Sequence, residues 1–157
     1  MHNKKDFQRR SELEKARASA LASLSMREHS VKELSTKLQQ KGYADDSIST
    51  VLQECLANNY LNDERFAEIY WRNRSAKGFG AKIIENELKF KGINSEIIGK
   101  SKNQEEIDFE KIIQRLYLKK FKGSAIADFK DKIKRQNYLY RRGFERELIN
   151  FVLEDFN

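Results

Sequence analysis

Proline is absent from this chain of 157 residues, and glycine occurs only seven times. Both residues punctuate the turns of all-β folds, so their scarcity argues against a sandwich or a barrel. Charged residues make up 35% of the sequence and the hydrophobic set 39%, with Leu, Lys, Glu and Arg prominent. These residue types have high helix propensity. The composition therefore predicts an all-α protein.

Cysteine is represented once, by Cys55, and histidine twice. A lone cysteine cannot form a disulfide within the chain or build a thiolate metal cluster, so a reducing environment is expected. No apolar run approaches the eighteen residues of a membrane-spanning helix, and the polar segment 1–10 lacks the apolar core of a signal peptide. We expect a cytoplasmic protein without a membrane association, metal or cofactor.

The sequence contains a repeated pattern with a spacing of about fifty residues. Lys41-Gly42-Tyr43 returns as Lys91-Gly92-Ile93 and as Arg142-Gly143-Phe144. In every copy an apolar residue lies four positions before the glycine and another lies six positions after it. A glycine in this position ends a helix, because it adopts the left-handed conformation that residues with a Cβ disfavour.

Each copy of the pattern predicts three helices. In the first copy, residues 11–25 are rich in alanine, Ser30 and Glu33 have the spacing of a capping box, and apolar residues from Ile48 to Leu56 recur at helical spacing. The last helix of the second copy is expected to be short, because Ser101 and Lys102 replace apolar residues there. We expect a disordered basic arm over 1–10 and three-helix repeats over 11–59, 60–103 and 104–157. Such units in series predict an elongated, curved array.

Positive charge is concentrated in the last third of the chain. The formal net charge is +7, yet residues 111–146 hold twelve Lys/Arg against three Asp/Glu, a local net charge of +9. Residues 43–70 have the opposite bias, with six acidic residues and one arginine. Clustered cations gain free energy by releasing the counterions condensed on a polyanion, so the pattern favours a polyanion-binding surface.

A second group of cations lies beside aromatic residues in the middle of the sequence. Tyr70 and Trp71 are followed closely by Arg72, Arg74 and Lys77. Bases stack on such aromatic rings while arginine contacts phosphate, as in proteins that bind single-stranded nucleic acid. Helical spacing from Phe66 favours a core role for Tyr70, so Trp71 and the arginines are the predicted surface residues.

No motif in the sequence predicts catalysis. His29 has no nucleophile or orienting partner nearby in the sequence, so a packing or capping role is expected. Residues Lys77-Gly78-Phe79-Gly80 lack the spacing of a phosphate-binding nucleotide loop and predict a link between two helices, with Gly80 near an N-cap. We therefore expect a protein that is not an enzyme.

Many short motifs, in order along nearly the whole chain, resemble the RecX regulatory protein family. They are Ala20-Leu21, Arg27-Glu28-His29-Ser30, Glu33-Leu34, Lys37-Leu38, Lys41-Gly42, Tyr60-Leu61-Asn62-Asp63, Arg65-Phe66-Ala67, Arg74-Ser75, Lys77-Gly78-Phe79-Gly80, Glu87-Leu88, Lys91-Gly92-Ile93, Lys119-Lys120-Phe121 and Arg141-Arg142-Gly143-Phe144. The resemblance implies a monomer of tandem three-helix units that lies in the groove of the RecA nucleoprotein filament. It further implies inhibition of the recombinase, ATPase and coprotease activities of RecA, and hence a role in recombinational DNA repair and the SOS response.

The contact surface for filament and DNA is predicted from the clustered cations. Its members are Arg72, Arg74, Lys77, Lys82, Lys89, Lys91, Lys132, Lys134, Arg135, Arg141 and Arg142. Weak electrostatic binding of single- and double-stranded DNA is expected. Two alternatives remain: a sequence-specific helix-turn-helix DNA-binding protein, and an α-solenoid adaptor for peptides that binds no nucleic acid.

Overall fold

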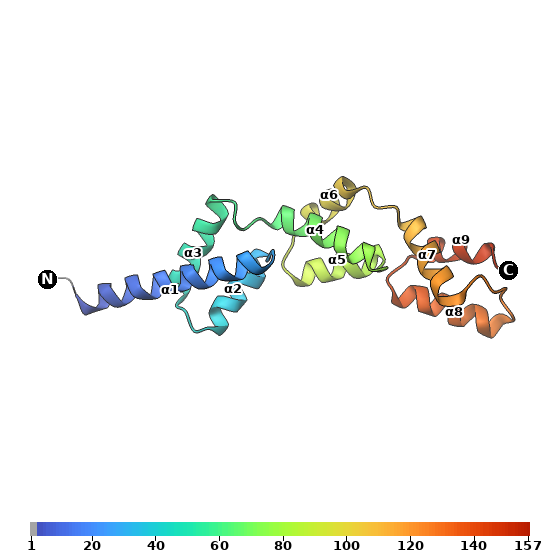
Figure 1. Cartoon of the computed structure of the whole chain (residues 1–157), viewed down its shortest axis with the longest axis horizontal. Helices are drawn as coiled ribbons and strands as arrows, with labels where there is room; N and C mark the ends of the chain where they lie inside the picture. The colour runs from blue at the N-terminus through green and yellow to red at the C-terminus, as the bar shows by residue number, and fades with distance from the viewer. Residues whose placement is uncertain (1–2) are drawn as a thin grey trace. The chain divides into compact units, whose positions relative to one another are not determined.

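Within residues 3–157, which the computed structural model describes, the chain forms nine α-helices and no β-strand (Figure 1). The helices are α1 (Lys4–Met26), α2 (Val31–Gln40), α3 (Asp45–Ala57), α4 (Asp63–Ala76), α5 (Ala81–Phe90), α6 (Ser95–Glu105), α7 (Phe109–Phe121), α8 (Phe129–Arg141) and α9 (Arg146–Glu154). They follow one another in groups of three, with a turn glycine between the second and third helix of each group. The prediction of an all-α protein with three tandem three-helix repeats is confirmed.

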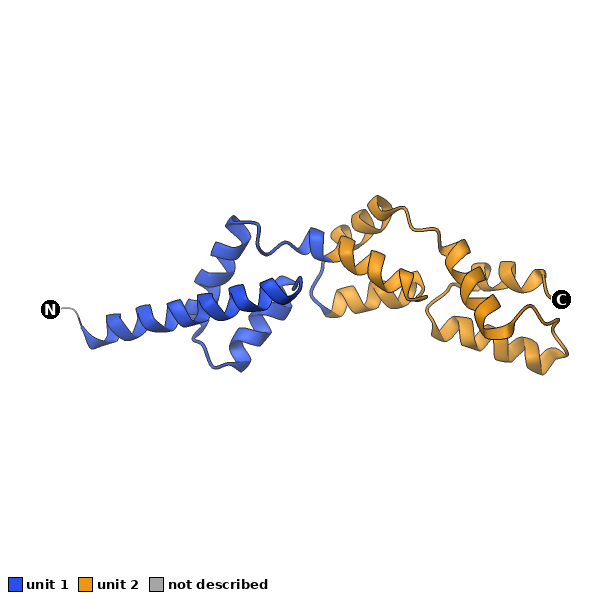
Figure 2. Ribbon diagram, in the orientation of Figure 1, with its two compact units in different colours: residues 1–66, 91–93 blue, residues 67–90, 94–157 orange. Residues whose placement is uncertain are grey.

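The described helices are organised into two compact units (Figure 2). Unit 1 extends to Phe66 and includes Lys91–Ile93, so it contains α1, α2, α3, the start of α4 and the turn that follows α5. Unit 2 consists of Ala67–Phe90 and Asn94–Asn157 and contains the third repeat entirely. No helix among the described residues is both long enough and apolar enough to span a membrane.

The N-terminal segment differs from its prediction. A disordered arm was expected over residues 1–10, but α1 begins at Lys4, and all residues from Asn3 to Arg10 are exposed. Adding residues to an existing helix costs little once the helix is nucleated, and this stretch contains neither glycine nor proline to stop it. Residues 1 and 2 lie outside the described part of the chain.

The core of unit 1 lies where its first three helices meet. Ala16 and Ala20 of α1 are fully buried against Leu34 of α2 and Val51 of α3. Alanine lets the helix backbones approach closely, while the larger side chains of α2 and α3 supply the buried apolar area. Leu56, which was expected on the core face of α3, is instead 45% exposed.

The three turn glycines adopt the predicted conformation. Gly42, Gly92 and Gly143 have φ of +86°, +83° and +96°. After each helix the chain folds back, as when the amide of Phe144 donates to the carbonyl of Leu139 at 3.3 Å. The prediction that these glycines terminate helices is confirmed, and close packing is found at Gly92, against Lys32, and at Gly143, against Ile83.

Two of the glycine turns also pack against the start of a helix in the preceding repeat. In unit 1, the Ser30 hydroxyl donates to the Lys91 carbonyl at 2.7 Å. In unit 2, the Gly80 amide donates to the Arg142 carbonyl, also at 2.7 Å. Ser30 and Gly80 each lie twelve residues before the turn glycine of their own repeat. The same contact is thus built once with a side-chain donor and once with a backbone donor.

The last helix of the second repeat is nearly as long as its counterpart in the first. Helix α6 has 11 residues and α3 has 13. Ser101 is buried in α6, and its hydroxyl donates to the Ile97 carbonyl at 2.6 Å. The polar residue is therefore accommodated without ending the helix.

Candidate functional site

Three of the predicted contact residues are held by carboxylates of the same unit. Arg72 pairs with Glu105 at 2.9 Å, and Arg74 with Glu87 at 2.9 Å. The hydrogen bond from Arg72 holds the pKa of Glu105 below its ordinary value. These arginines keep part of their side chains exposed, but their charge is partly compensated.

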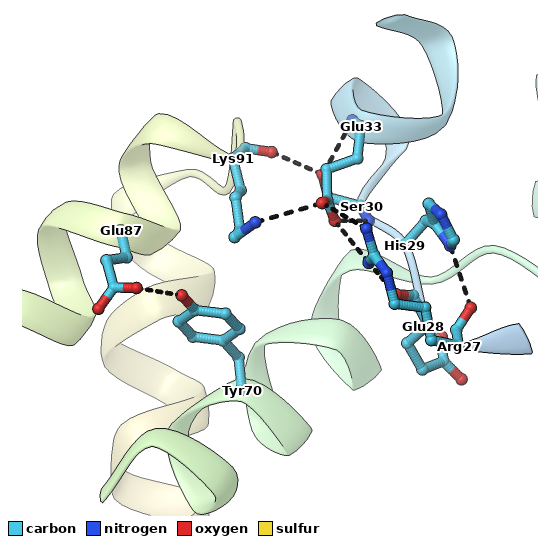
Figure 3. A network of polar contacts seen from close by, with 8 residues as sticks. All are labelled: Arg27, Glu28, His29, Ser30, Glu33, Tyr70, Glu87 and Lys91. Atoms are coloured by element: carbon cyan, nitrogen blue, oxygen red, sulfur yellow. Dashed lines mark hydrogen bonds and ion pairs between the residues drawn. The ribbon is translucent and has the colours of Figure 1, made fainter. Parts of the chain in front are cut away.

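Lys91, the third of these residues, belongs to a network at the start of α2 (Figure 3). Its ammonium group lies 3.2 Å from Glu33, which also accepts hydrogen bonds from Arg27 and from the Ser30 amide. Burial by itself would raise the pKa of Glu33, but the hydrogen bonds outweigh burial and hold the pKa below its ordinary value. Ser30 completes the predicted capping box, because its hydroxyl accepts from the Glu33 amide at 3.1 Å.

His29 lies buried in the loop that precedes this helix. Its Nδ1 is 3.0 Å from the Arg27 carbonyl, so Nδ1 carries the proton and donates it (Figure 3). Burial lowers the pKa of His29 and favours the neutral ring. The predicted packing role agrees with this position. Among the described residues, no group of three or more His, Cys, Asp and Glu is arranged to hold a metal ion.

Arg135 must be removed from the predicted surface. It is only 3% exposed, and its guanidinium donates to the Tyr117 hydroxyl at 2.5 Å, the Ser124 carbonyl at 2.7 Å and the Ala125 carbonyl at 3.1 Å. Asp131 pairs with it at 3.0 Å. Arg135 therefore holds the loop between α7 and α8 in place through hydrogen bonds to its backbone.

The prediction that Trp71 lies on the surface is also wrong. Trp71 is fully buried, and its indole N–H donates to the Ile98 carbonyl at 3.1 Å. The hydroxyl of the half-buried Tyr70 donates to Glu87 (Figure 3). A buried ring with its polar hydrogen satisfied cannot stack on a base.

Arg142 has both a structural role and an uncompensated charge. Its guanidinium donates to the carbonyls of Lys77 at 2.9 Å and Gly78 at 3.3 Å, and it lies 4.2 Å from the centre of the Phe79 ring. No carboxylate of the described chain forms an ion pair with it. Arg142 thus joins α8 to the end of α4 while it keeps its positive charge.

The other six predicted residues form no ion pair with any residue from 3 to 157. They are Lys77, Lys82, Lys89, Lys132, Lys134 and Arg141. All are exposed except Lys132, which is half-buried. Their ammonium and guanidinium groups are available to an external anion.

A concavity of about 120 Å³ in unit 2 brings three cations together. Its lining includes Lys77 after α4 and Arg115 and Lys119 of α7, with Ser75, Ala76, Gly78, Ile112 and Leu116. The guanidinium of Arg142 lies beside Gly78 and adds a fourth positive charge. No acidic residue of the described part of the chain lines this space. We call Lys77, Arg115, Lys119 and Arg142 the cation cluster.

Arg115 and Lys119 were not among the predicted contact residues. They lie four positions apart, so a helix places both on one face. The sequence contained this signal, but it did not reveal that this face of α7 adjoins the end of α4.

These features define a helical-repeat protein with an acid-free cluster of cations in its second unit. Three RecX family models match successive parts of the chain: the first three-helix domain at residues 16–55, the second at 62–100 and the third at 106–153. The chain belongs to the RecX regulatory protein family. The resemblance seen in the sequence motifs is confirmed.

Individual relatives are similar over almost their whole length. Regulatory protein RecX of Legionella pneumophila (strain Corby) is 38% identical over 141 residues, which cover 90% of this chain and 94% of the relative. Regulatory protein RecX of Vibrio vulnificus (strain CMCP6) is 33% identical over 136 residues, covering 87% and 89%. The crystal structure of RecX from Lactobacillus salivarius shares the fold, with a TM-score of 0.74 at 21% identity and coverage of 93% and 97%. The helix-turn-helix alternative is not favoured by these matches.

Proposed function

We propose that this chain binds the RecA nucleoprotein filament and inhibits its recombinase, ATPase and coprotease activities. The chain acts by occupying the filament and performs no chemistry of its own. Membership of the RecX family supports the partner, and the cation cluster supports contact with the DNA of the filament. The cluster is the observation that carries the proposal.

Electrostatics explain why the cation cluster suits the phosphate backbone. Three positive charges line the space and Arg142 adds a fourth beside Gly78, while no carboxylate of the described residues lines it, so their field is not cancelled locally. Arg142 is fixed by two carbonyls and a ring, so part of the site is already ordered before an anion arrives. The predicted residues Lys82, Lys89, Lys132, Lys134 and Arg141 extend the surface, whereas Arg72, Arg74 and Lys91 contribute with partly compensated charge.

The RecA-dependent hydrolysis of ATP on single-stranded DNA tests the proposal. The chain should lower the steady-state rate, and Lys119→Glu should require a higher concentration for the same inhibition. Each lost phosphate contact should also reduce the salt dependence of DNA binding by about one unit of slope. Lys37→Glu in α2 makes the same charge change at an exposed lysine of unit 1 and should inhibit like the parent chain. No effect of the parent chain on RecA would refute the proposed function.

A further inference from the structure

Unit 2 contains a second concavity, between α8 and α9, that the cation cluster does not include. It measures about 280 Å³ and is lined by Gln136, Asn137 and Tyr140 of α8 and by Arg146, Ile149 and Asn150 of α9. Ile149 is buried and forms an apolar floor, while three amides, a phenol and a guanidinium surround it. We call this concavity the α8 groove.

The polar side chains of the α8 groove have no hydrogen-bond partner in the described part of the chain. Within residues 3–157, none of the side chains of Gln136, Asn137, Tyr140, Arg146 and Asn150 takes part in a hydrogen bond or ion pair. Tyr140 is 62% exposed. Its ring therefore offers a face to a planar ligand, and the amides offer both donors and acceptors.

Exposed apolar residues lie along α8 on the side of the groove. Phe129 and Ile133 lie on the same helix face as Tyr140 and are 77% and 37% exposed. Beside these residues, Lys130, Lys134 and Arg141 occupy positions i, i+4 and i+11, so one helix edge presents all three charges. At 1.5 Å per residue this row spans about 16 Å.

The acids near this row do not cancel it. Asp128 caps the amide of Asp131, and Asp131 pairs with the buried Arg135. Glu145 and Glu147 adjoin Arg146 in the sequence, and within residues 3–157 neither forms an ion pair with a cation of α8. The result is a row of aromatic and amide groups next to a row of positive charge.

We infer that the α8 groove binds single-stranded polynucleotide, with Tyr140 stacked on a base and the amides against base edges. Lys130, Lys134 and Arg141 contact the phosphates. A single strand presents a flat base beside every phosphate, whereas a duplex hides the base faces and an acidic peptide does not place a ring beside each charge. The inference deepens the proposed function, because it names the component of the filament that this groove takes.

The test measures binding of fluorescein-labelled oligo(dT) to the isolated chain by fluorescence anisotropy, without RecA. Tyr140→Ala should weaken binding about 5- to 150-fold, the effect of losing one stacked base. Tyr140→Phe should keep the parent affinity, because stacking needs only the ring. Tyr60→Ala, at a tyrosine that is 54% exposed in unit 1, is the matched control and should not change the affinity.

A strand with abasic sites provides the deciding comparison, because it retains the phosphates and lacks the bases. Tyr140→Ala should bind this strand as the parent chain does. Parent-like affinity of Tyr140→Ala for oligo(dT), or an equal loss on the abasic strand, would overturn the inference. Circular dichroism and Trp71 fluorescence establish that each variant is folded. RecA is absent from this assay, so its outcome is independent of the ATPase experiment.

Discussion

Replacing Gly143 with alanine tests whether the glycine turns join successive repeats. Two costs act at this position. The backbone φ of +96° is strained for any residue with a Cβ, at about 1–2 kcal/mol. The new methyl group would also lie 2.8 Å from Cγ1 and 2.9 Å from the backbone nitrogen of Ile83, and overpacking of this kind costs about 1–3 kcal/mol. The free energy of unfolding of unit 2 should therefore fall by about 2–5 kcal/mol.

Two other alanine substitutions separate these costs. Gly42 has nearly the same φ, +86°, but a Cβ there would meet no atom of residues 3–157 within 4 Å, so Gly42→Ala should cost only the conformational term of about 1–2 kcal/mol. Gly80 has no positive φ, yet its Cβ would overlap the Gly143 carbonyl, so Gly80→Ala reports the steric term alone.

Urea unfolding followed by fluorescence assigns the effects to the two units. Trp71 is the only tryptophan and is buried in unit 2, so its emission reports that unit. Gly143→Ala and Gly80→Ala should lower the urea concentration at the midpoint of the fluorescence transition. Gly42→Ala should instead lower the midpoint of the unfolding of unit 1, followed by circular dichroism. If Gly143→Ala were no more destabilising than Gly42→Ala, close packing of the turn on Ile83 would be refuted.

Two further substitutions concern buried or paired charges. Glu33 has a lowered pKa when folded, so its contribution to stability is present above its ordinary pKa of about 4.3 and disappears as the pH falls through the folded value. Glu33→Gln should therefore be less stable than the parent at pH 7 and nearly equal to it at strongly acidic pH in urea titrations; an equal difference at both pH values would contradict the assignment. Arg135→Met should lower the free energy of unfolding by about 1–3 kcal/mol, because the Tyr117 hydroxyl and two carbonyls lose their donor. The salt dependence of its DNA binding should stay unchanged, and a reduced slope would show that Arg135 reaches the DNA.

Local rules predicted much of the fold from the sequence. The Ser30–Glu33 capping box and the turn glycines involve residues close together in the chain, so their spacing carries the information. The apolar residues before and after each glycine likewise identified buried positions such as Leu38 and Ile48.

The candidate site was harder to predict, because contacts between distant segments decide which of its residues are buried and which are exposed. Trp71 is satisfied by the Ile98 carbonyl, 27 residues away, and a sequence window around Trp71 does not contain that partner. Arg135 was counted with the surface cations because linear charge counting does not distinguish a solvated guanidinium from one that ties a loop. Tyr140 was overlooked because only the packing of α8 on α9 creates the groove beside it.

The contact between a turn and the preceding repeat also limits where further repeats can be added to such a protein. Helix α8 has 13 residues, whereas α2 and α5 have 10. In the third repeat, the extra turn of α8 therefore occupies the position at which Ser30 and Gly80 precede the helices of the first two repeats. The Gly42 turn, in contrast, has open space around the position of a Cβ. A gene duplication that lengthens the protein would therefore be tolerated ahead of the first repeat, and one appended after the third would find no complementary partner.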